Sequence, residues 1–418
     1  MSTLQPVRGT KDFLPLESEI FRYINNTAFN TAKLYGYGEI HTPIFEFSNV
    51  FQKTLGETSD IVGKEMYSFT DRGGEQITLR PEGTAGIARS FISEGLAQQI
   101  PLKLYYCGPM FRYERPQKGR FRQFHQIGVE CIGIPSAHAD IECISLSNDI
   151  FKKFNLDKKV KLELNTLGDS QSREKHRTLL VEYLEKFKND LSADSKIRLD
   201  KNPLRILDSK DANDQKILID APTINSTLTD ESKKFFDDVC NGLIALDIPF
   251  EINNKLVRGL DYYTHTVFEW TTSFLGAQGT VLAGGRYDGL IKMMGGPATE
   301  GVGWASGIER LILLLEEDFN KNKITTNKIA VICADDDSYN YSLKVSQSLR
   351  DKNFIVEHPH SGNVGKKLKR ADKVGCTWAC IIGSTEVQNN SVTLKNLKTG
   401  DQNNFSLSDL VSTLLTMN

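Results

Sequence analysis

Apolar and polar positions alternate along residues 102–133, on both sides of a polar loop at 115–120. Alternation with a period of two is typical of a β-strand with one buried face, so this stretch predicts two strands joined by the loop. On the second strand Ile127, Val129 and Cys131 point toward an apolar layer. The opposite face carries Phe124, Gln126, Gly128 and Glu130.

This opposite face has the composition of a binding-site floor. Arg112 and Glu114 share a face on the first strand, so the hairpin presents two carboxylates, an arginine, a glutamine and an exposed phenylalanine. Such a set has no packing rationale, and the central Gly128 leaves room for a ligand. A solvated face with incidental ion pairs is the alternative interpretation.

Two further segments predict strands with polar side chains. In ITLRPEGT, residues 77–84, alternate positions place Thr78, Arg80 and Glu82 on one face. Gly83 and Thr84 then form a turn or begin the helix that AGIARSFI continues. In LVRGLDYYTHTVFEW, residues 256–270, the RGLDYY segment sets a cation, an acid and two phenols beside a glycine that permits close approach. A packed aromatic strand is the alternative interpretation of this second segment.

The segment GVGWASGIERLILLLE, residues 301–316, predicts a helix with glycines at its entrance. Its apolar stripe consists of Ile308, Leu311, Ile312 and Leu315. Arg310 leaves the helix by another face. The glycine pattern is not the GxGxxG that follows a strand in dinucleotide-binding folds, so a dinucleotide site is not indicated.

The residue composition and the hydrophobic periodicity of the chain change along its length. Residues 1–168 and 251–318 are rich in glycine, arginine and aromatics, whereas 169–250 has helical periodicity. We therefore expect one domain in two pieces, interrupted by a helical insertion. Residues 319–327 have linker composition, and in 328–418 strands alternate with amphipathic helices. That alternation predicts a small α/β domain with a largely parallel sheet.

Composition and charge narrow the classes of function. A length of 418 residues suggests about three domains, and the net charge of −2 argues against bulk electrostatic binding of nucleic acid. No apolar run is long enough to span a membrane, and the N-terminus lacks a signal-peptide core. The seven cysteines, none in a CxxC pair, favour reduced thiols in the cytoplasm. No metal-ligand spacing is present, and His358 and His360 resemble a strand end.

Two basic clusters remain as candidates for phosphate contact. The hairpin loop region contains four cations without an acid among them: Arg115, Lys118, Arg120 and Arg122. Such a cluster suits polyphosphate or an RNA backbone, although it is also typical of a soluble hairpin tip. A second cluster begins a predicted helix with Lys366, Lys367, Lys369 and Arg370. A solvated helix face is the alternative there.

Taken together, these segments resemble class II aminoacyl-tRNA synthetases, and among them the histidyl-tRNA synthetases. GYGEIHTPIFE at 36–46 is similar to the family's motif 1, and we expect it to form a strand. MFRYE, the loop and FRQFHQIGVE together are similar to motif 2, and GVGWASGIER is similar to motif 3. RPEGT at 80–84 and LVRGLDYY at 256–263 resemble the two histidine-specific signatures. The resemblance covers nearly the whole chain.

The resemblance implies an α+β fold: an antiparallel catalytic core from 1–168 and 251–318, the helical insertion at 169–250, and an α/β anticodon-binding domain at 328–418. It also implies a cytoplasmic homodimer with motif 1 near its interface. The implied reaction activates L-histidine with ATP and Mg²⁺, then transfers it to histidine tRNA. No protein ligand cage for the metal is expected, because Mg²⁺ accompanies the phosphates.

The resemblance also assigns roles to individual residues. The expected catalytic residues are Arg112, Arg258 and Arg310. The expected histidine-binding residues are Glu82, Gly83, Thr84, Arg112, Gln126, Glu130, Arg258, Tyr262 and Tyr263. ATP is expected to contact Arg112, Glu114, Arg120, Phe124 and Arg310, and tRNA to contact Gln117, Lys118, Lys366, Lys367 and Arg370. Arginines suit this chemistry, since an anionic carboxylate must approach an anionic phosphate.

Two other interpretations share the resemblance. A regulatory subunit of ATP phosphoribosyltransferase has the same histidine-binding fold but usually lacks the C-terminal domain and key arginines. A class II synthetase for threonine, proline or glycine has a similar C-terminal domain, against which RGLDYY argues.

Overall fold

The computed structural model describes residues 4–55, 61–258, 262–276, 279–321 and 328–416. The chain divides into two compact units, residues 1–317 and 318–418. The insertion expected at 169–250 lies within the first unit, so its standing as a separate domain and the other proposed boundaries stay predictions. Most of the linker expected at 319–327 lies outside the described residues.

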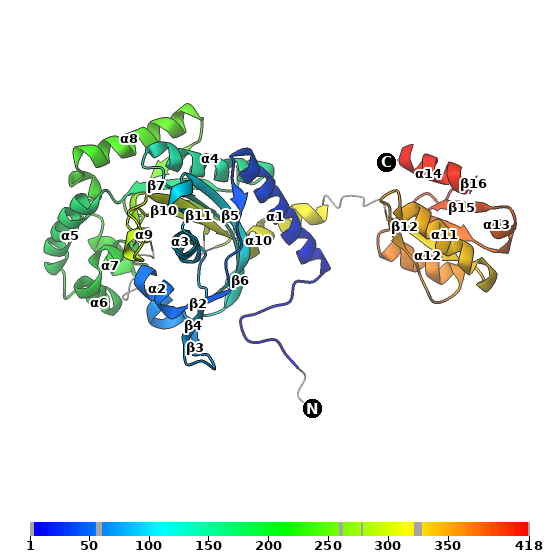
Figure 1. The fold of residues 1–418 in the computed structure, drawn as a ribbon, viewed down its shortest axis with the longest axis horizontal. Helices are drawn as coiled ribbons and strands as arrows, with labels where there is room; N and C mark the ends of the chain where they lie inside the picture. Colours follow the sequence, from blue (N-terminus) through cyan, green and yellow to red (C-terminus); the bar gives the residue numbers. More distant parts are fainter. Residues whose placement is uncertain (1–3, 56–60, 259–261, 277–278, 322–327, 417–418) are drawn as a thin grey trace. The chain divides into compact units, whose positions relative to one another are not determined.

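An eight-stranded sheet forms the centre of the first unit (Figure 1). Its strands, in spatial order, are β1 (Gly38–Glu39), β5 (Leu102–Phe111), β6 (Gln123–Ile132), β11 (Gly301–Gly307), β10 (Thr280–Arg286), β9 (Thr264–Thr271), β7 (Lys161–Thr166) and β8 (Phe250–Ile252). The strands from β5 to β7 pair antiparallel, and only the two outer pairs, β1–β5 and β7–β8, are parallel. The predicted hairpin and the antiparallel core are thus confirmed.

Helix α4 (Ala137–Lys153) packs against one face of this sheet. The indole N–H groups of Trp270 and Trp304 donate to Ser147 Oγ and to the Cys143 carbonyl, at 2.8 and 3.0 Å. The apolar side of β6 is buried as expected, because Ile127, Val129 and Cys131 are at most 1% exposed. The opposite face of β6 is therefore left free to carry polar groups.

A second apolar cluster joins α3 to the other side of the hairpin. It includes Ile87 and Phe91 of α3 together with Tyr106 and Met110 of β5. Outside the insertion, the other helical segments that lie wholly or mostly in the first unit are α1 (Pro15–Leu34), α2 (Ser48–Leu55), η1 (Ile61–Glu65), α3 (Thr84–Ser93), η2 (Leu96–Gln99), α9 (Leu290–Met293) and α10 (Ile308–Lys321). A small sheet consists of β2 (Phe45–Phe47), β4 (Gln76–Leu79) and β3 (Tyr67–Thr70).

The insertion is helical, as the periodicity predicts. Its segments are α5 (Ser170–Glu185), α6 (Ala193–Lys201), η3 (Pro203–Asp208), α7 (Ala212–Ile217), η4 (Ile224–Ser226) and α8 (Asp230–Ala245). Leucines from α5, α6 and η3 form its apolar core around Leu180, Leu184 and Ile206. The chain returns to the large sheet at β8, which begins at Phe250.

The second unit contains a five-stranded sheet, ordered β13 (Ile355–Glu357), β12 (Lys328–Cys333), β14 (Trp378–Ile382), β15 (Ser391–Asn396) and β16 (Gln402–Ser406). Its helical segments are η5 (Asp336–Ser338), α11 (Tyr339–Arg350), α12 (Val364–Lys373), α13 (Ser384–Gln388) and α14 (Leu407–Thr416). The α/β prediction is confirmed, but the sheet is not largely parallel: β15 and β16 pair antiparallel. The chain from β14 to β15 contains only the short α13, so it does not cross back to make a parallel neighbour.

Three strand predictions were too long. The segment 36–46 forms two short strands in different sheets, because Pro43 lacks an N–H and the Thr42 carbonyl accepts from Arg80. Strand β4 ends at Leu79, two residues before Pro81 and before the helix start at Thr84. Strand β9 begins only at Thr264, and the centre of RGLDYY, residues 259–261, lies outside the described residues.

Candidate active site

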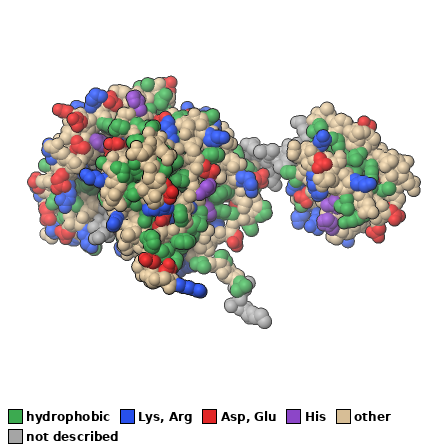
Figure 2. Space-filling view, in the orientation of Figure 1, with side chains coloured by type: hydrophobic (Ala, Val, Ile, Leu, Met, Phe, Trp, Pro, Cys, Tyr) green, Lys and Arg blue, Asp and Glu red, His purple; other side chains and the backbone are tan. Residues whose placement is uncertain are grey.

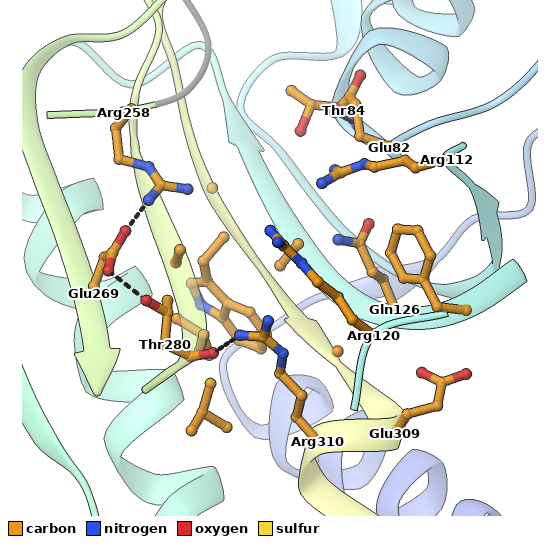
Figure 3. A pocket seen from close by; sticks show the side chains of 18 of the residues that line it. Glu82, Thr84, Arg112, Arg120, Gln126, Arg258, Glu269, Thr280, Glu309 and Arg310 are labelled. Carbon is orange, nitrogen blue, oxygen red and sulfur yellow. Dashed lines mark hydrogen bonds and ion pairs between the residues drawn. The ribbon is translucent and has the colours of Figure 1, made fainter. Parts of the chain in front are cut away.

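A cavity of about 340 Å³ opens over the polar face of the large sheet, where β6, β11, β10 and β9 are neighbours (Figure 3). The predicted site residues that line it are Glu82, Thr84, Arg112, Glu114, Arg120, Phe124, Gln126, Arg258, Tyr262, Tyr263 and Arg310. They come from segments more than two hundred residues apart. Gly83, Glu130, Gln117 and Lys118 do not line the cavity, and the lysines and Arg370 predicted for tRNA belong to the second unit.

Arg258 belongs to one wall of the cavity and is paired there. Its guanidinium forms an ion pair with Glu269 of β9, and Thr280 donates a 2.8 Å hydrogen bond to the same carboxylate (Figure 3). The side chains of Arg258 and Glu269 are 17% and 15% exposed. Arg258 is therefore not an exposed cation of the pocket, because the Glu269 carboxylate covers it.

Arg112 belongs to the opposite wall. Its Nε donates to the Pro81 carbonyl at 2.8 Å, which fastens it to the chain between β4 and α3. Its guanidinium carbon lies 5.2 Å from the centre of the Phe124 ring, and Nη1 is 3.9 Å from Glu114. Arg112 therefore has its planar group held in place while part of its hydrogen-bonding capacity stays unused.

Arg310 and Arg120 bring two positive charges to the cavity (Figure 3). Arg310 donates to the Thr280 carbonyl, and Arg120 lies 2.5 Å from Glu114. Burial lowers the pKa of Arg310, and the neighbouring charges of Arg120 and Arg112 lower it further. The charge of Glu114 offsets this decrease only in part. A group of anionic oxygens placed here would relieve that repulsion, so the wall suits a polyphosphate.

Glu82 serves two purposes at the beginning of α3. Its carboxylate accepts the backbone N–H groups of Thr84 and Ala85, both at 2.7 Å, and so caps the helix. Burial raises the pKa of Glu82, although these hydrogen bonds and Arg112 oppose the rise. Each carboxylate oxygen has a second lone pair, so Glu82 can still accept a hydrogen bond from a ligand in the cavity.

Glu130 lies beneath the cavity and is 1% exposed. It accepts hydrogen bonds from Thr84 at 2.6 Å and from Tyr287 at 2.5 Å. Burial raises the pKa of Glu130 to about 8, with a further contribution from Glu82 and against the effect of the two hydroxyls. Gly303 makes this position possible, because a β-carbon there would collide with the carboxylate.

The space above Gly128 is occupied. The ring of Tyr106, directly opposite on β5, fills it so closely that a β-carbon at 128 would overlap the phenol. The expectation that Gly128 leaves room for a ligand is therefore wrong, since the room accommodates a side chain of the protein. Burial raises the pKa of Tyr106 well above its usual value, with Glu130 and Glu82 adding to the effect.

Several functional candidates were missed in the sequence. Glu269 forms the ion pair with Arg258 and accepts the Thr280 hydroxyl. Tyr287 donates a hydrogen bond to Glu130. Glu309 accepts the backbone N–H of His125 at 2.9 Å and so ties α10 to the start of β6. Two signals in the sequence were available: Glu269 is an acid inside the otherwise uncharged strand THTVFEWT, and Glu309 is an acid directly before Arg310.

The predicted tRNA contacts differ in how free they are. Gln117 and Lys118 are exposed at the hairpin tip, which a pair of backbone hydrogen bonds between Gln117 and Arg120 closes. Arg122 of the same cluster already has a partner within the protein, because its guanidinium carbon lies 3.7 Å from the centre of the Tyr113 ring. In the second unit, Lys366 and Arg370 are exposed on α12, whereas Lys367 donates to the Cys333 carbonyl at 2.7 Å.

Two features are absent from the described residues. Within the described ranges, no group of three or more His, Cys, Asp or Glu side chains is placed to hold a metal ion. In that same part of the chain, no helix has the length and apolar character needed to cross a membrane.

Known proteins match the chain over nearly its full length. The family profile described as Histidyl-tRNA synthetase matches residues 9–172 and 180–311, and the one described as Anticodon binding domain matches 328–417. The histidine–tRNA ligase of Rhodospirillum rubrum is 51% identical over 410 residues, 98% of each chain. The apo histidyl-tRNA synthetase of S. aureus superposes with a TM-score of 0.82 at 35% identity, covering 99% of this chain and 100% of that one.

A structure titled ATP phosphoribosyltransferase regulatory subunit/histidyl-tRNA synthetase, from Bacillus halodurans, is similar at the level of the fold. Its TM-score is 0.61 at 22% identity, over 88% of this chain and 97% of that one. An antiparallel sheet with an arginine-lined cavity, followed by an anticodon-binding domain, is the build of a class II aminoacyl-tRNA synthetase. The chain belongs to the histidyl-tRNA synthetase family.

Proposed function

We propose that this protein is a histidine–tRNA ligase, which forms histidyl-adenylate from L-histidine and ATP and transfers the histidyl group to tRNA. One observation carries the proposal: a single cavity is lined by Glu82 and Tyr263 together with Arg112, Arg120 and Arg310. An acid and a phenol at fixed separation suit the two nitrogens of an imidazole. The arginines suit a triphosphate.

In the first step, a carboxylate oxygen of histidine attacks the α-phosphorus of ATP, and pyrophosphate leaves with the bonding electrons. The carboxylate is ionised at pH 7 and needs no general base. Its approach to another anion is the main obstacle, which preorganised cations reduce. We assign Arg112 to the α-phosphate, Arg310 and Arg120 to the γ-phosphate, and Arg258 to the substrate carboxylate or α-phosphate.

The remaining pocket residues select the amino acid. Glu82 and Tyr263 would bind the imidazole, with Tyr262 beside it, whereas Thr84, Gln126 and the deeper Glu130 would attract the ammonium group. Gly83 keeps the backbone close to this group, and Phe124 with Glu114 would hold the adenine. A competing amino acid would leave these buried groups unpaired, which strengthens discrimination.

Mg²⁺ enters this proposal only with ATP. Three of the four carboxylates that line the cavity are paired with other side chains or backbone: Glu114 with Arg120, Glu269 with Arg258, and Glu309 with His125. The fourth, Glu82, accepts the backbone N–H groups at the start of α3. The described residues therefore offer no ready cage, and we assign no side chain to the metal, which would be held by phosphate oxygens and water.

In the second step, a terminal hydroxyl of histidine tRNA attacks the adenylate and AMP leaves. We assign Gln117 and Lys118 to the acceptor end and Lys366, Lys367 and Arg370 to the anticodon region. For Lys367 this contact would replace its bond to Cys333. An enzyme that charges tRNA for protein synthesis would act in the cytoplasm.

We also propose a homodimer with residues 36–46 near the interface. Large apolar side chains are exposed there and on the adjacent strand, with Ile44, Phe45 and Phe47 44%, 57% and 53% exposed. Figure 2 shows hydrophobic side chains, in green, on the visible face of the first unit. Light scattering at micromolar concentration should give twice the mass of the chain, and a stable monomer would contradict the proposal.

Pyrophosphate exchange with each of the twenty amino acids, followed by charging of histidine tRNA, tests the function. We expect exchange with histidine alone. Histidine binding without exchange would favour the regulatory-subunit interpretation, and exchange with threonine, proline or glycine would favour another class II synthetase.

A further inference from the structure

The helical insertion contacts the amino-acid pocket through one side chain. Arg173, in the first turn of α5, donates from Nη1 to the carbonyl oxygen of Tyr263 at 2.8 Å. Tyr263 lines the cavity and is 7% exposed, and its ring lies 4.6 Å from that of Tyr262. A guanidinium of the insertion is therefore fixed to the backbone of a residue that forms the pocket.

The segment that follows Tyr263 also depends on neighbouring elements. His265 has φ of 45°, a left-handed conformation that is unfavourable for a residue with a side chain. Backbone hydrogen bonds with Gly168 and Leu167 hold it, at 2.9 and 2.7 Å. Its ring contacts that of Phe235 of α8 in a tilted arrangement, with the ring centres 4.9 Å apart.

The beginnings of α5 and α8 form one connected group. Asp169 caps α5 through the Ser172 N–H at 2.7 Å and accepts the hydroxyl of Thr229, the N-cap residue of α8, at 2.6 Å. Ser172 in turn accepts the Thr229 N–H at 2.9 Å. A displacement of one helix would therefore carry the other with it, together with both contacts to the 263–265 segment.

We infer that Arg173 is a positioning residue for histidine binding, which holds Tyr263 in place and couples the insertion to the amino-acid pocket. This inference rests on the proposed function. Arg173 does not line the cavity, so it acts through Tyr263. Since coupling is reciprocal, a bound amino acid should in turn hold the first turn of α5.

Kinetics of pyrophosphate exchange with Arg173→Ala and Arg173→Lys provide the test. We expect Arg173→Ala to raise the KM for histidine roughly tenfold, the effect of losing one charged hydrogen bond, with the KM for ATP nearly unchanged. Arg173→Lys keeps a hydrogen-bond donor, so its KM for histidine should lie between those of the wild type and Arg173→Ala. The matched control is Arg177→Ala on the same helix, since Arg177 is 46% exposed and pairs only with Glu174 among the described residues; it should behave as wild type.

Amide hydrogen exchange provides a readout that a merely structural role would not move. Histidine should slow exchange at residues 170–176 in the wild type and not in Arg173→Ala. An unchanged histidine KM in Arg173→Ala, or an equal rise in both KM values together with a lower melting temperature, would overturn the inference alone. A wild-type protein without histidine-dependent pyrophosphate exchange would overturn the proposed function and the inference with it.

Discussion

Arg258 and Glu269 form an ion pair inside the wall of the cavity, with both side chains less than one fifth exposed. Glu269 also accepts the Thr280 hydroxyl, so the carboxylate is held from two sides (Figure 3). The pair fixes the direction of the guanidinium before any substrate arrives. Orientation of this kind is what makes a cation effective against charge that develops during a reaction.

Replacing Arg258 by Ala should reduce adenylate formation by roughly 10²–10³-fold, comparable to the loss of other preorganised electrostatic contacts. It should also lower the free energy of unfolding by about 1–3 kcal/mol, because Glu269 is left without its partner. Pyrophosphate exchange and urea unfolding measure the two effects. Near-normal exchange would remove Arg258 from the mechanism.

The double variant Arg258→Met, Glu269→Gln separates the two consequences. Neutralising both partners avoids an unpaired charge, so most of the lost stability should return while exchange stays low. If exchange returned together with stability, the role of Arg258 would be structural.

Glu130 should make histidine binding dependent on pH. Its pKa of about 8 means that the carboxyl is largely protonated at pH 7, whereas attraction of an ammonium group requires the anion. Binding of histidine at pH 7 should therefore release a large part of one proton. Calorimetry in buffers of different ionisation enthalpy measures this release, which should be much smaller in Glu130→Gln.

The same group affects stability with a defined sign. Since the folded pKa lies above the unfolded value, the folded protein binds the extra proton between about pH 4.5 and 8. The contribution of Glu130 to stability is thus complete below this window and lost as the pH rises through it. Glu130→Gln should show a shallower decline in unfolding free energy over that range, and an identical decline would contradict the assignment.

Asp214 should stabilise the insertion. This fully buried carboxylate accepts the Ser192 N–H and the hydroxyls of Ser192, Ser195 and Ser209, at 2.6–2.9 Å. Asp214→Ala leaves these donors unsatisfied and should cost roughly 2–4 kcal/mol, measured by amide exchange in α6 and α7. Asp208→Ala, which removes an acid that is 51% exposed, is the control and should have little effect.

Low pH should reduce the difference in stability between Asp214→Ala and the wild type. Burial acts to raise the pKa of Asp214, but the hydrogen bonds outweigh it and the pKa is lowered overall. A depressed pKa stabilises the fold above the unfolded value of about 3.9, and the effect is lost as the pH falls below it. A difference that stayed constant down to pH 2 would contradict this account.

Removal of residues 328–418 should separate adenylate formation from tRNA charging. The described apolar clusters of the two units have no residue in common, so the truncated chain keeps every residue of the first unit's described clusters. We expect exchange to continue, charging to fall through weaker tRNA binding, and the salt dependence of binding to become shallower. Unchanged charging by a folded preparation would mean that α12 is only a solvated face.

The sequence by itself determined which face of each element is apolar. Alternation predicted the β5–β6 hairpin, and the stripe beginning at Ile308 predicted α10 with Arg310 on a different side. These features follow from the period of strand and helix, which local spacing specifies directly. The resemblance of the motifs then indicated the family.

Only the tertiary structure decided which groups meet across elements. Glu269 neutralises Arg258 from the next strand, Tyr106 fills the space above Gly128, and Arg173 reaches Tyr263 across 90 residues of chain. Periodicity gives the direction of a side chain but not the element that covers it, because packing depends on contacts between segments far apart in sequence. Strand ends were misjudged for a related reason: Pro81 and the cap at Glu82 end β4 where apolar alternation alone would continue it.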